Sequence, residues 1–401
     1  MLKSIVLPLL FFGMQCSFAQ QYQIVIKGGH VIDPKNNIDE ILDVAISHGR
    51  ILKTAKNIDT INAHQVINAR GMYVVPGLID MHTHDFYGVD PDRHFCNGSE
   101  SVLPDSFAFR SGVTTVVDAG SSGWKDFPDF RKKIIDSSKT RVLAFLNIVG
   151  AGMRGRAFEQ DTIDMDANKT AFIAQQYHNY IVGIKLAHFK GPQWKPVDEA
   201  IKAGVMANIP VMIDFGESAT PLSMQELFLQ HLRPGDIFTH CFAQLKGRES
   251  IVDTMTKKLK SFVWNAGKRG ILFDVGYGEI SFSFSQAIPA ISEGFHPNTI
   301  STDMHAVRKY KMKYLTEIMS EFLAIGMSIH DVVEAVTWNP AKEIKHQELG
   351  NLSKGAIADI TILHVRNNII VFFDHTGHTI EGSKKFECEM TIKGGKIVYR
   401  N

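Results

Sequence analysis

The chain has 401 residues, which exceeds one typical domain and favours a large core domain with a smaller appended one. Its 44% hydrophobic and 21% charged residues are ordinary for a globular protein and exclude wholesale disorder. The 43 Lys and Arg residues balance 42 Asp and Glu residues, so the formal charge of +1 gives no sign of a nucleic-acid or membrane-surface partner. A small molecule is the expected partner, and homo-oligomer formation stays open.

Residues 1–19 have the pattern of a signal peptide. Lys3 precedes an apolar run at residues 5–12, which is too short to span a bilayer. Ser17-Phe-Ala19 then offers small residues at the two positions that a signal peptidase inspects. We therefore expect cleavage before Gln20, a periplasmic or secreted protein, and no membrane insertion once the signal is removed.

Both ends of the remaining chain have β-strand patterns. Alternating apolar residues flank Lys27-Gly-Gly29, and His48-Gly49 joins two further apolar runs, so two hairpins are predicted here. Residues 392–398 repeat the first of these motifs almost residue for residue. We predict one small β-sandwich domain that is built from residues 20–75 and 346–401.

The central residues, 76–345, alternate between short apolar runs and segments with helical patterns. Apolar strands that alternate with helices are typical of a parallel sheet, and eight such units fit an α/β fold of the (β/α)8 TIM-like barrel type. Ser328 is a plausible N-cap of one of the last helices. Strands are predicted at residues 75–84, 115–118, 142–146, 182–186, 211–215, 236–240, 271–275 and 299–303. Helices are predicted at residues 127–137, 168–180, 197–208, 223–232, 315–325 and 328–338.

Residues that can bind a metal follow several of these strands. His82 and His84 are two residues apart in the first strand, so their side chains share one face at about 6.6 Å, close enough to share an ion. The carboxyl ends of barrel strands open on one face, where active sites lie. Imidazoles and carboxylates together suit a divalent ion such as Zn²⁺. The other candidate residues at strand ends are Lys185, Asp214, His240 and Asp303.

Each of these four residues also has an ordinary structural explanation. Lys185 could lie on the surface, and Asp303 could cap the helix that follows it. His240 could be a hydrogen-bonded core histidine, and Asp214 could pair with a neighbouring cation. Agreement at five strand ends favours a shared site over these separate explanations.

Seven motifs distributed over the chain carry a further inference. They are Pro76-Gly-Leu-Ile-Asp-Met-His82-Thr-His84, Gly112-Val-Thr-Thr-Val-Val-Asp-Ala-Gly120, Val182-Gly-Ile-Lys185, Phe238-Thr-His240-Cys-Phe, Phe273-Asp-Val-Gly276, Ser301-Thr-Asp303-Met-His305 and Thr337-Trp-Asn-Pro340-Ala. As a set they resemble the amidohydrolase superfamily of metal-dependent hydrolases. Residues 274–284 and Arg233-Pro-Gly-Asp236 resemble its dihydroorotase-like branch, the amidohydrolase/deacetylase metallohydrolases.

The resemblance implies two divalent metal ions, with Zn²⁺ as the expected metal. His82, His84 and Asp303 would bind the first ion, and His240 would bind the second. Lys185 would be carboxylated on its amine, and the carbamate would bridge the two ions. Asp303 would be the catalytic residue that takes a proton from the metal-bridging water or hydroxide as it attacks a carbonyl, and passes it to the leaving group. The implied activity is hydrolysis of an amide or ester acyl bond, with deacetylation of a small N-acyl amino acid or O-acetyl substrate as the leading hypothesis.

Two positions depart from the pattern of the family. Asp214 stands where relatives have a metal-binding His at the end of the fifth strand, which changes the charge at the second ion and favours harder metals. Tyr277 stands where relatives tend to have a His that serves the substrate. We retain Asp214 as a candidate ligand and Tyr277 as a candidate substrate-binding residue.

Basic loops supply the remaining substrate-binding candidates. They would overhang the site, and arginine binds carboxylates through two parallel hydrogen bonds, so an acidic substrate is conceivable. The alternative is that these are solvated loop charges. The residues are Arg154, Arg156, His305 and Arg308.

Two other functions remain open at this stage. The first is cyclic amide hydrolysis of the dihydroorotase or hydantoinase kind, which is weakened because Phe86 stands where dihydroorotase-like chains usually place an Arg. The second is a barrel that has lost catalysis and acts as a binding protein. That hypothesis leaves Lys185 and Asp303 unexplained, because a buried lysine without a partner is costly. Bound metal separates an enzyme from such a binding protein.

Overall fold

The structure is a computed structural model that describes residues 22–87, 101–155, 157–215, 218, 222–306 and 312–401. The predicted signal peptide and two predicted substrate-binding residues, Arg156 and Arg308, lie outside the described residues. Within this described part, none of the helices combines the length and the hydropathy needed to cross a membrane.

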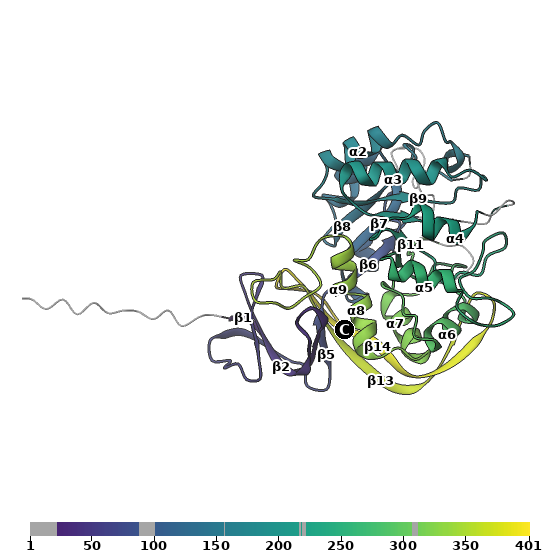
Figure 1. The fold of residues 1–401 in the computed structure, drawn as a ribbon. Coiled ribbons are helices and arrows are strands. Elements are labelled where there is room, and N and C mark those ends of the chain that lie inside the picture. Colours follow the sequence, from purple (N-terminus) through teal and green to yellow (C-terminus); the bar gives the residue numbers. More distant parts are fainter. Residues whose placement is uncertain (1–21, 88–100, 156, 216–217, 219–221, 307–311) are drawn as a thin grey trace, which may run out of the picture.

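The central part of the chain forms a parallel barrel, as predicted (Figure 1). Seven strands pair in chain order into one sheet. The eighth predicted run is not a regular strand, but it bridges both ends of the sheet, through Thr299 with Asp274 and through Met304 with Thr83. These two parallel bridges close the barrel. The seven strands are β6 (Leu78–Thr83), β7 (Val113–Gly123), β8 (Arg141–Asn147), β9 (Ile181–Leu186), β10 (Val211–Ile213), β11 (Ile237–Phe238) and β12 (Leu272–Phe273).

The barrel strands bury side chains on both faces because each is covered by side chains of the opposite strands within and by helices outside. Met212 and Ile237 belong to the cluster that fills the interior, where Ala341 of α9 (Trp338–Glu343) also packs. Their neighbours Ile213 and Phe238 belong to the outer cluster beneath the helices. Alternation with a period of two residues therefore holds in these short strands, and it determines which side chains face the barrel axis.

The predicted helices are present with shifted boundaries. The first and fourth continue as π-helical turns, at Arg131–Ile135 and Leu227–His231. The last predicted helix ends earlier than predicted, as α8, and α9 follows it from Trp338. The Ser328 hydroxyl accepts a hydrogen bond from Asp331 N at 3.0 Å, so the predicted N-cap is confirmed. The helices are α1 (Phe127–Phe130), α2 (Ala167–Gln176), α3 (Lys195–Ala207), α4 (Met224–Glu226), α5 (Ser261–Lys268), α6 (Phe284–Ser292), α7 (Leu315–Ala324), α8 (Ile329–Ala335) and α9.

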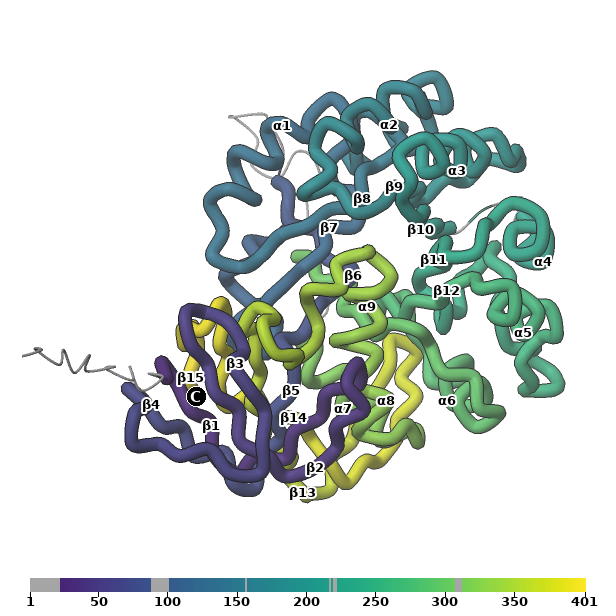
Figure 2. Tube along the Cα trace, turned by 60° about the vertical axis from the view of Figure 1, so that its left-hand side comes forward, coloured from purple at the N-terminus to yellow at the C-terminus, as the bar shows by residue number. Residues whose placement is uncertain are grey.

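The two chain ends meet in a second, mixed sheet, which Figure 2 shows as purple and yellow segments side by side. Its eight strands have the order β15-β14-β13-β5-β1-β2-β3, with β4 paired to β1. The long β13–β14 hairpin also reaches the barrel, where Phe386 N donates to Ser320 Oγ of α7 at 2.9 Å. The strands are β1 (Tyr22–Asp33), β2 (Ile38–Ser47), β3 (Arg50–Ala55), β4 (Ala63–Asn68), β5 (Tyr73–Pro76), β13 (Ile360–Phe373), β14 (Thr379–Lys393) and β15 (Lys396–Arg400).

The two similar Gly-Gly motifs adopt different structures. Gly394 and Gly395 form the turn between β14 and β15, with φ angles of 54° and 75°. The hairpin predicted at Lys27-Gly-Gly29 is wrong, since β1 continues through it with a bulge. A Cβ at Gly29 would lie 2.4 Å from Val74 Cγ2, so glycine here permits the close approach of β5. Packing against a neighbouring strand, and not the local motif, decides this structure.

Candidate metal centre

The six predicted metal-binding residues converge at the carboxyl ends of the barrel strands. His82 lies near the end of β6, and His84 directly follows that strand. Lys185 lies near the end of β9, and Asp214 and His240 follow β10 and β11. Asp303 belongs to the run that closes the barrel. All six residues are buried, with exposed fractions between 0% for Lys185 and 8% for His84. The strand pattern therefore brings together residues that are up to 221 positions apart.

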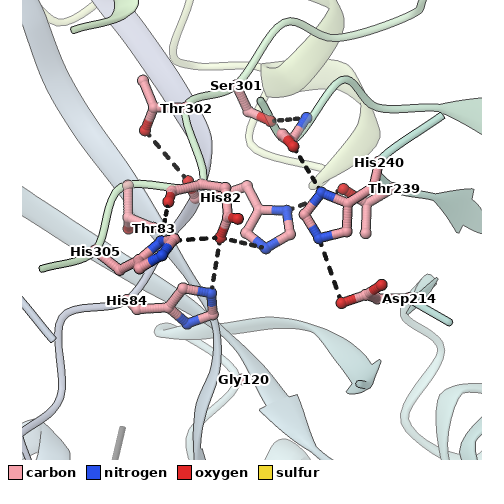
Figure 3. Close-up of polar contacts among 12 residues, drawn as sticks. His82, Thr83, His84, Gly120, Asp214, Thr239, His240, Ser301, Thr302 and His305 are labelled. Carbon is pink, nitrogen blue, oxygen red and sulfur yellow. Dashed lines mark hydrogen bonds and ion pairs between the residues drawn. The ribbon is translucent and has the colours of Figure 1, made fainter. Parts of the chain in front are cut away.

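The first group of donors surrounds the Asp303 carboxylate. Asp303 Oδ1 lies 3.0 Å from His84 Nε2 and 3.4 Å from His82 Nε2. Donor atoms of His82, His240 and Asp303 all lie within 4.8 Å of one another, and Figure 3 shows the rings of His82, His84 and His240 turned toward one space. Two or three imidazoles with a carboxylate form a donor set that suits Zn²⁺. These residues fit a metal ion.

A second group surrounds the Asp214 carboxylate. Asp214 Oδ2 lies 3.3 Å from His240 Nε2 and 3.4 Å from His188 Nε2. The other ring nitrogen of His188 lies 3.3 Å from Glu159 Oε1. Burial raises the pKa of Asp214, but the imidazoles of His240 and His188 outweigh it and hold that pKa well below its ordinary value. Asp214 is therefore an anion that faces His240 across the site.

Lys185 is fully buried and has no carboxylate within hydrogen-bonding distance among the described residues. Its Nζ lies 3.4 Å from His82 Nε2 and 3.4 Å from Met212 Sδ. Burial lowers the pKa of Lys185, although Asp214 and Asp303 oppose this effect. A lowered pKa favours the neutral amine, which is the form that adds to CO₂. Both the burial and the weak partners of Lys185 fit a carbamate that binds metal better than they fit an ammonium ion.

Gly120 supplies the space for Lys185. Its φ is +93°, and a Cβ there would lie 2.7 Å from Lys185 Cγ. Gly120 O accepts a hydrogen bond from Asn147 Nδ2 at 2.9 Å, which holds this segment of β7 against β8. Glycine is required here both for its backbone conformation and for the room that it leaves.

Hydrogen bonds beneath the site orient His82. Its Nδ1 lies 2.9 Å from Thr239 Oγ1 and 3.5 Å from Asp274 Oδ2. Asp274 also accepts hydrogen bonds from the hydroxyls of Thr239, Thr299 and Ser301, each at 2.7 Å to one of its oxygens. Such outer partners determine the orientation and the basicity of metal-binding histidines. Asp274 belongs to the motif Phe273-Asp-Val-Gly276, but no pattern in the sequence predicts this role.

Asp80 connects β6 to the run that carries Asp303. Its carboxylate accepts hydrogen bonds from Thr302 N at 3.0 Å and from Thr302 Oγ1 at 2.6 Å. Burial raises the pKa of Asp80 to about 7. The bonds to Thr302 hold the closing segment in register beside His82, so the distance between His82 and Asp303 depends on a buried acid that no sequence pattern marks as functional.

Two site residues have uncommon backbone conformations. The φ angles of His240 and Asp303 are 53° and 52°, in the left-handed region that few residues other than glycine adopt. His240 Nδ1 lies 2.6 Å from Gly276 O, and only a protonated nitrogen can donate to a carbonyl, so Nε2 is the atom left to face Asp214. Strained backbone of this kind is concentrated at functional sites.

The predicted substrate-binding residues occupy different places. His305 adjoins the centre, since its Nδ1 lies 2.5 Å from Asp303 O and its ring centroid lies 6.1 Å from that of His84 (Figure 3). Arg154 Nη2 lies 3.4 Å from Asp126 Oδ2. The Tyr277 hydroxyl accepts a hydrogen bond from Lys313 Nζ at 2.6 Å, and its ring stacks on Phe282, so this tyrosine is engaged with the surrounding core. The substrate contacts of all three residues stay predictions.

Comparisons with known proteins agree with this site. The model of the Amidohydrolase family matches residues 283–398. A deacetylase of Brucella anthropi is 31% identical over 90% of this chain and 88% of its own. A deacetylase of Agrobacterium fabrum is 32% identical over 83% of this chain and 81% of its own.

Solved structures give the same result. An adenine deaminase superposes with a TM-score of 0.84 at 28% identity and covers 95% of this chain and 100% of its own. A dihydroorotase has a TM-score of 0.79 at 27% identity and covers 94% of this chain and 99% of its own. The similarity over most of the sequence, together with the buried histidines and carboxylates at the carboxyl end of the barrel, shows that this chain is a hydrolase of the amidohydrolase family.

Proposed function

We propose that this protein is a metal-dependent deacetylase that removes the acyl group from a small N-acyl amino acid or O-acetyl substrate. The observation that carries the proposal is the buried group of His82, His240 and Asp303 beside the fully buried Lys185. The two deacetylases at 31% and 32% identity support the choice of reaction within the family.

Each residue of the centre would have a distinct role in binding two divalent ions, with Zn²⁺ as the expected metal. His82, His84 and Asp303 would hold the first ion, and His240 and Asp214 would hold the second. Lys185, carboxylated by CO₂, would lie between them. Such ions lower the pKa of a bound water toward neutrality and polarise a carbonyl.

Asp303 is the residue placed to move the proton. Burial raises the pKa of its carboxyl, but His305, His82 and His84 outweigh burial and hold that pKa far below its ordinary value. Asp303 is therefore ionised across the neutral range and can accept a proton from the attacking water at its carboxylate. It then returns this proton to the amine or alkoxide that leaves, as a general base followed by a general acid.

Cyclic amide hydrolysis is the second candidate, supported by the dihydroorotase of similar structure. The environment of Phe86 argues against the dihydroorotase version. Phe86 is 0% exposed and its ring centroid lies 5.1 Å from that of Phe130, so it is part of the apolar core. The Phe86 side chain therefore cannot hold a substrate carboxylate as an arginine would.

The test begins with the metal content of protein that was expressed with bicarbonate and purified without chelator. We expect about two ions per chain by inductively coupled plasma mass spectrometry, and release of acetate from members of a panel of N-acetyl amino acids and acetyl esters. Dihydroorotate and hydantoins serve as the alternative substrates. Protein that takes up no metal after addition of Zn²⁺, Mn²⁺ or Fe²⁺ would refute the proposal and leave a binding protein.

We also propose that residues 1–19 are a signal peptide and that the protein acts in the periplasm or outside the cell. The support is the charge, the apolar run and the small residues at 17 and 19. Mass spectrometry of the protein from a periplasmic extract should give a chain that begins at Gln20. An intact amino terminus in the cytoplasmic fraction would contradict this.

A further inference from the structure

Asp214 presents a physical problem at the second ion. A carboxylate is shorter than an imidazole and rotates more freely about its last bond, so it needs an additional partner to hold its oxygens toward a metal. In this chain the partner is His188, which lies in the loop after β9. Its Nε2 is 3.4 Å from Asp214 Oδ2, the same oxygen that lies 3.3 Å from His240 Nε2.

The other ring nitrogen of His188 contacts a second carboxylate, that of Glu159. His188 Nδ1 lies 3.3 Å from Glu159 Oε1, and the Glu159 side chain is only 7% exposed. Glu159, His188 and Asp214 therefore form a continuous chain of polar contacts that starts in the loop after β8 and ends at the metal centre. Both ring nitrogens of His188 thus face carboxylate oxygens, those of Glu159 and Asp214, so its place is behind Asp214.

The backbone of His188 has an uncommon conformation that several hydrogen bonds maintain. Its φ is 55°, in the left-handed region, where non-glycine residues are uncommon. His188 N donates to Asp214 O at 3.2 Å, and His188 O accepts from Gln160 Nε2 at 2.8 Å. Gln160 Oε1 also accepts from Lys190 N at 2.8 Å. Several independent contacts thus maintain a strained conformation that directs the imidazole at Asp214.

We propose that His188 is a positioning residue that holds the Asp214 carboxylate, so that Asp214 can replace the histidine that relatives use at the second ion. The inference rests on the proposed two-ion function. Outer partners of metal ligands usually contribute 10-fold to 100-fold to metal affinity. Loss of His188 should therefore weaken the second ion selectively and leave the first in place.

The experiment compares His188→Ala and His188→Gln with the wild-type holoenzyme. Glutamine keeps a nitrogen that can donate to Asp214, whereas alanine removes it. His178→Ala is the matched control, since His178 is exposed, its Nδ1 lies 3.1 Å from Gln175 O, and it precedes β9 at the end of that strand opposite to Lys185. The readouts are Zn²⁺ per chain after dialysis, the dissociation constant of the second ion, and the visible spectrum of the Co²⁺-substituted protein.

We expect His188→Ala to hold about one ion per chain and to bind the second about 10-fold to 100-fold more weakly, with recovery in His188→Gln and no change in His178→Ala. Circular dichroism confirms that the variants are folded. Two tightly bound ions and an unchanged Co²⁺ spectrum in His188→Ala would overturn the inference while the proposed function stands. Fewer than two ions in the wild-type protein would instead overturn the two-ion function, and the inference with it.

Discussion

Replacement of Gly120 by alanine tests whether the centre depends on the position of Lys185. The φ of +93° is unfavourable for alanine by about 1–2 kcal/mol. The new Cβ would also lie 2.7 Å from Lys185 Cγ and 2.8 Å from Lys185 Cβ, so the buried lysine must shift. Overpacking of this kind costs about 1–3 kcal/mol. Together these effects should lower the free energy of unfolding by about 2–5 kcal/mol.

Gly235→Ala separates the two contributions. Its φ is +90°, but a Cβ there meets nothing within 4 Å, so only the backbone cost of about 1–2 kcal/mol applies. Urea unfolding of both variants should therefore differ by about 1–3 kcal/mol. We also expect Gly120→Ala to lose metal and most of its acetate release, while Gly235→Ala keeps both. Equal stabilities, or a fully active Gly120→Ala protein, would refute the argument that Gly120 determines the position of Lys185.

Four further predictions concern catalysis, metal and stability. Asp303→Asn should lower kcat for acetate release by at least about 10²-fold to 10⁴-fold because the proton acceptor and an anionic ligand of the first ion are both lost, with the fold retained by circular dichroism. Dialysis against a chelator should abolish acetate release and lower the Tm, and Zn²⁺ should restore both; unchanged activity in the metal-free protein would contradict this. Ser328→Ala should cost about 1 kcal/mol in urea unfolding and leave kcat unchanged, since it removes only the bond to Asp331 N. Burial raises the pKa of Glu321 from 4.5 to about 7, so its contribution to stability is complete below pH 4.5 and is lost as the pH rises through 7. The stability of the wild-type protein relative to Glu321→Gln should therefore fall by about 3 kcal/mol between pH 4.5 and pH 8, and a difference independent of pH would contradict the shift.

The barrel was predictable because its signal is local and repeated. Short apolar strands separated by helical segments favour a parallel sheet whatever the details of packing. Side chains alternate between the two faces of a strand, which also placed His82 and His84 on one face. The common direction of barrel strands placed the remaining candidates at one end of the barrel, namely Lys185, Asp214, His240 and Asp303. The N-cap at Ser328 was predictable for the same reason, since a cap depends on residues only three positions apart.

Features that depend on contacts between distant parts of the chain were decided only by the tertiary structure. The Lys27-Gly-Gly29 segment became a bulge because β5 packs against it, although nearly the same motif forms a turn at Gly394 and Gly395. The eighth run is held by bridges to both edges of the sheet, which no local pattern contains. Its polar side chains likewise found partners, such as Asp80 for Thr302, only when the barrel closed.

The same distinction applies to the metal centre. The sequence by itself determined which residue types stand at the strand ends, because alternation along a strand depends only on the covalent geometry of the backbone. Only the folded chain decided that His188 lies behind Asp214, that Asp274 and Thr239 orient His82, and that the Tyr277 hydroxyl is engaged by Lys313. Hydrogen bonds act over about 3 Å, so they depend on the exact approach of segments that are far apart in the chain.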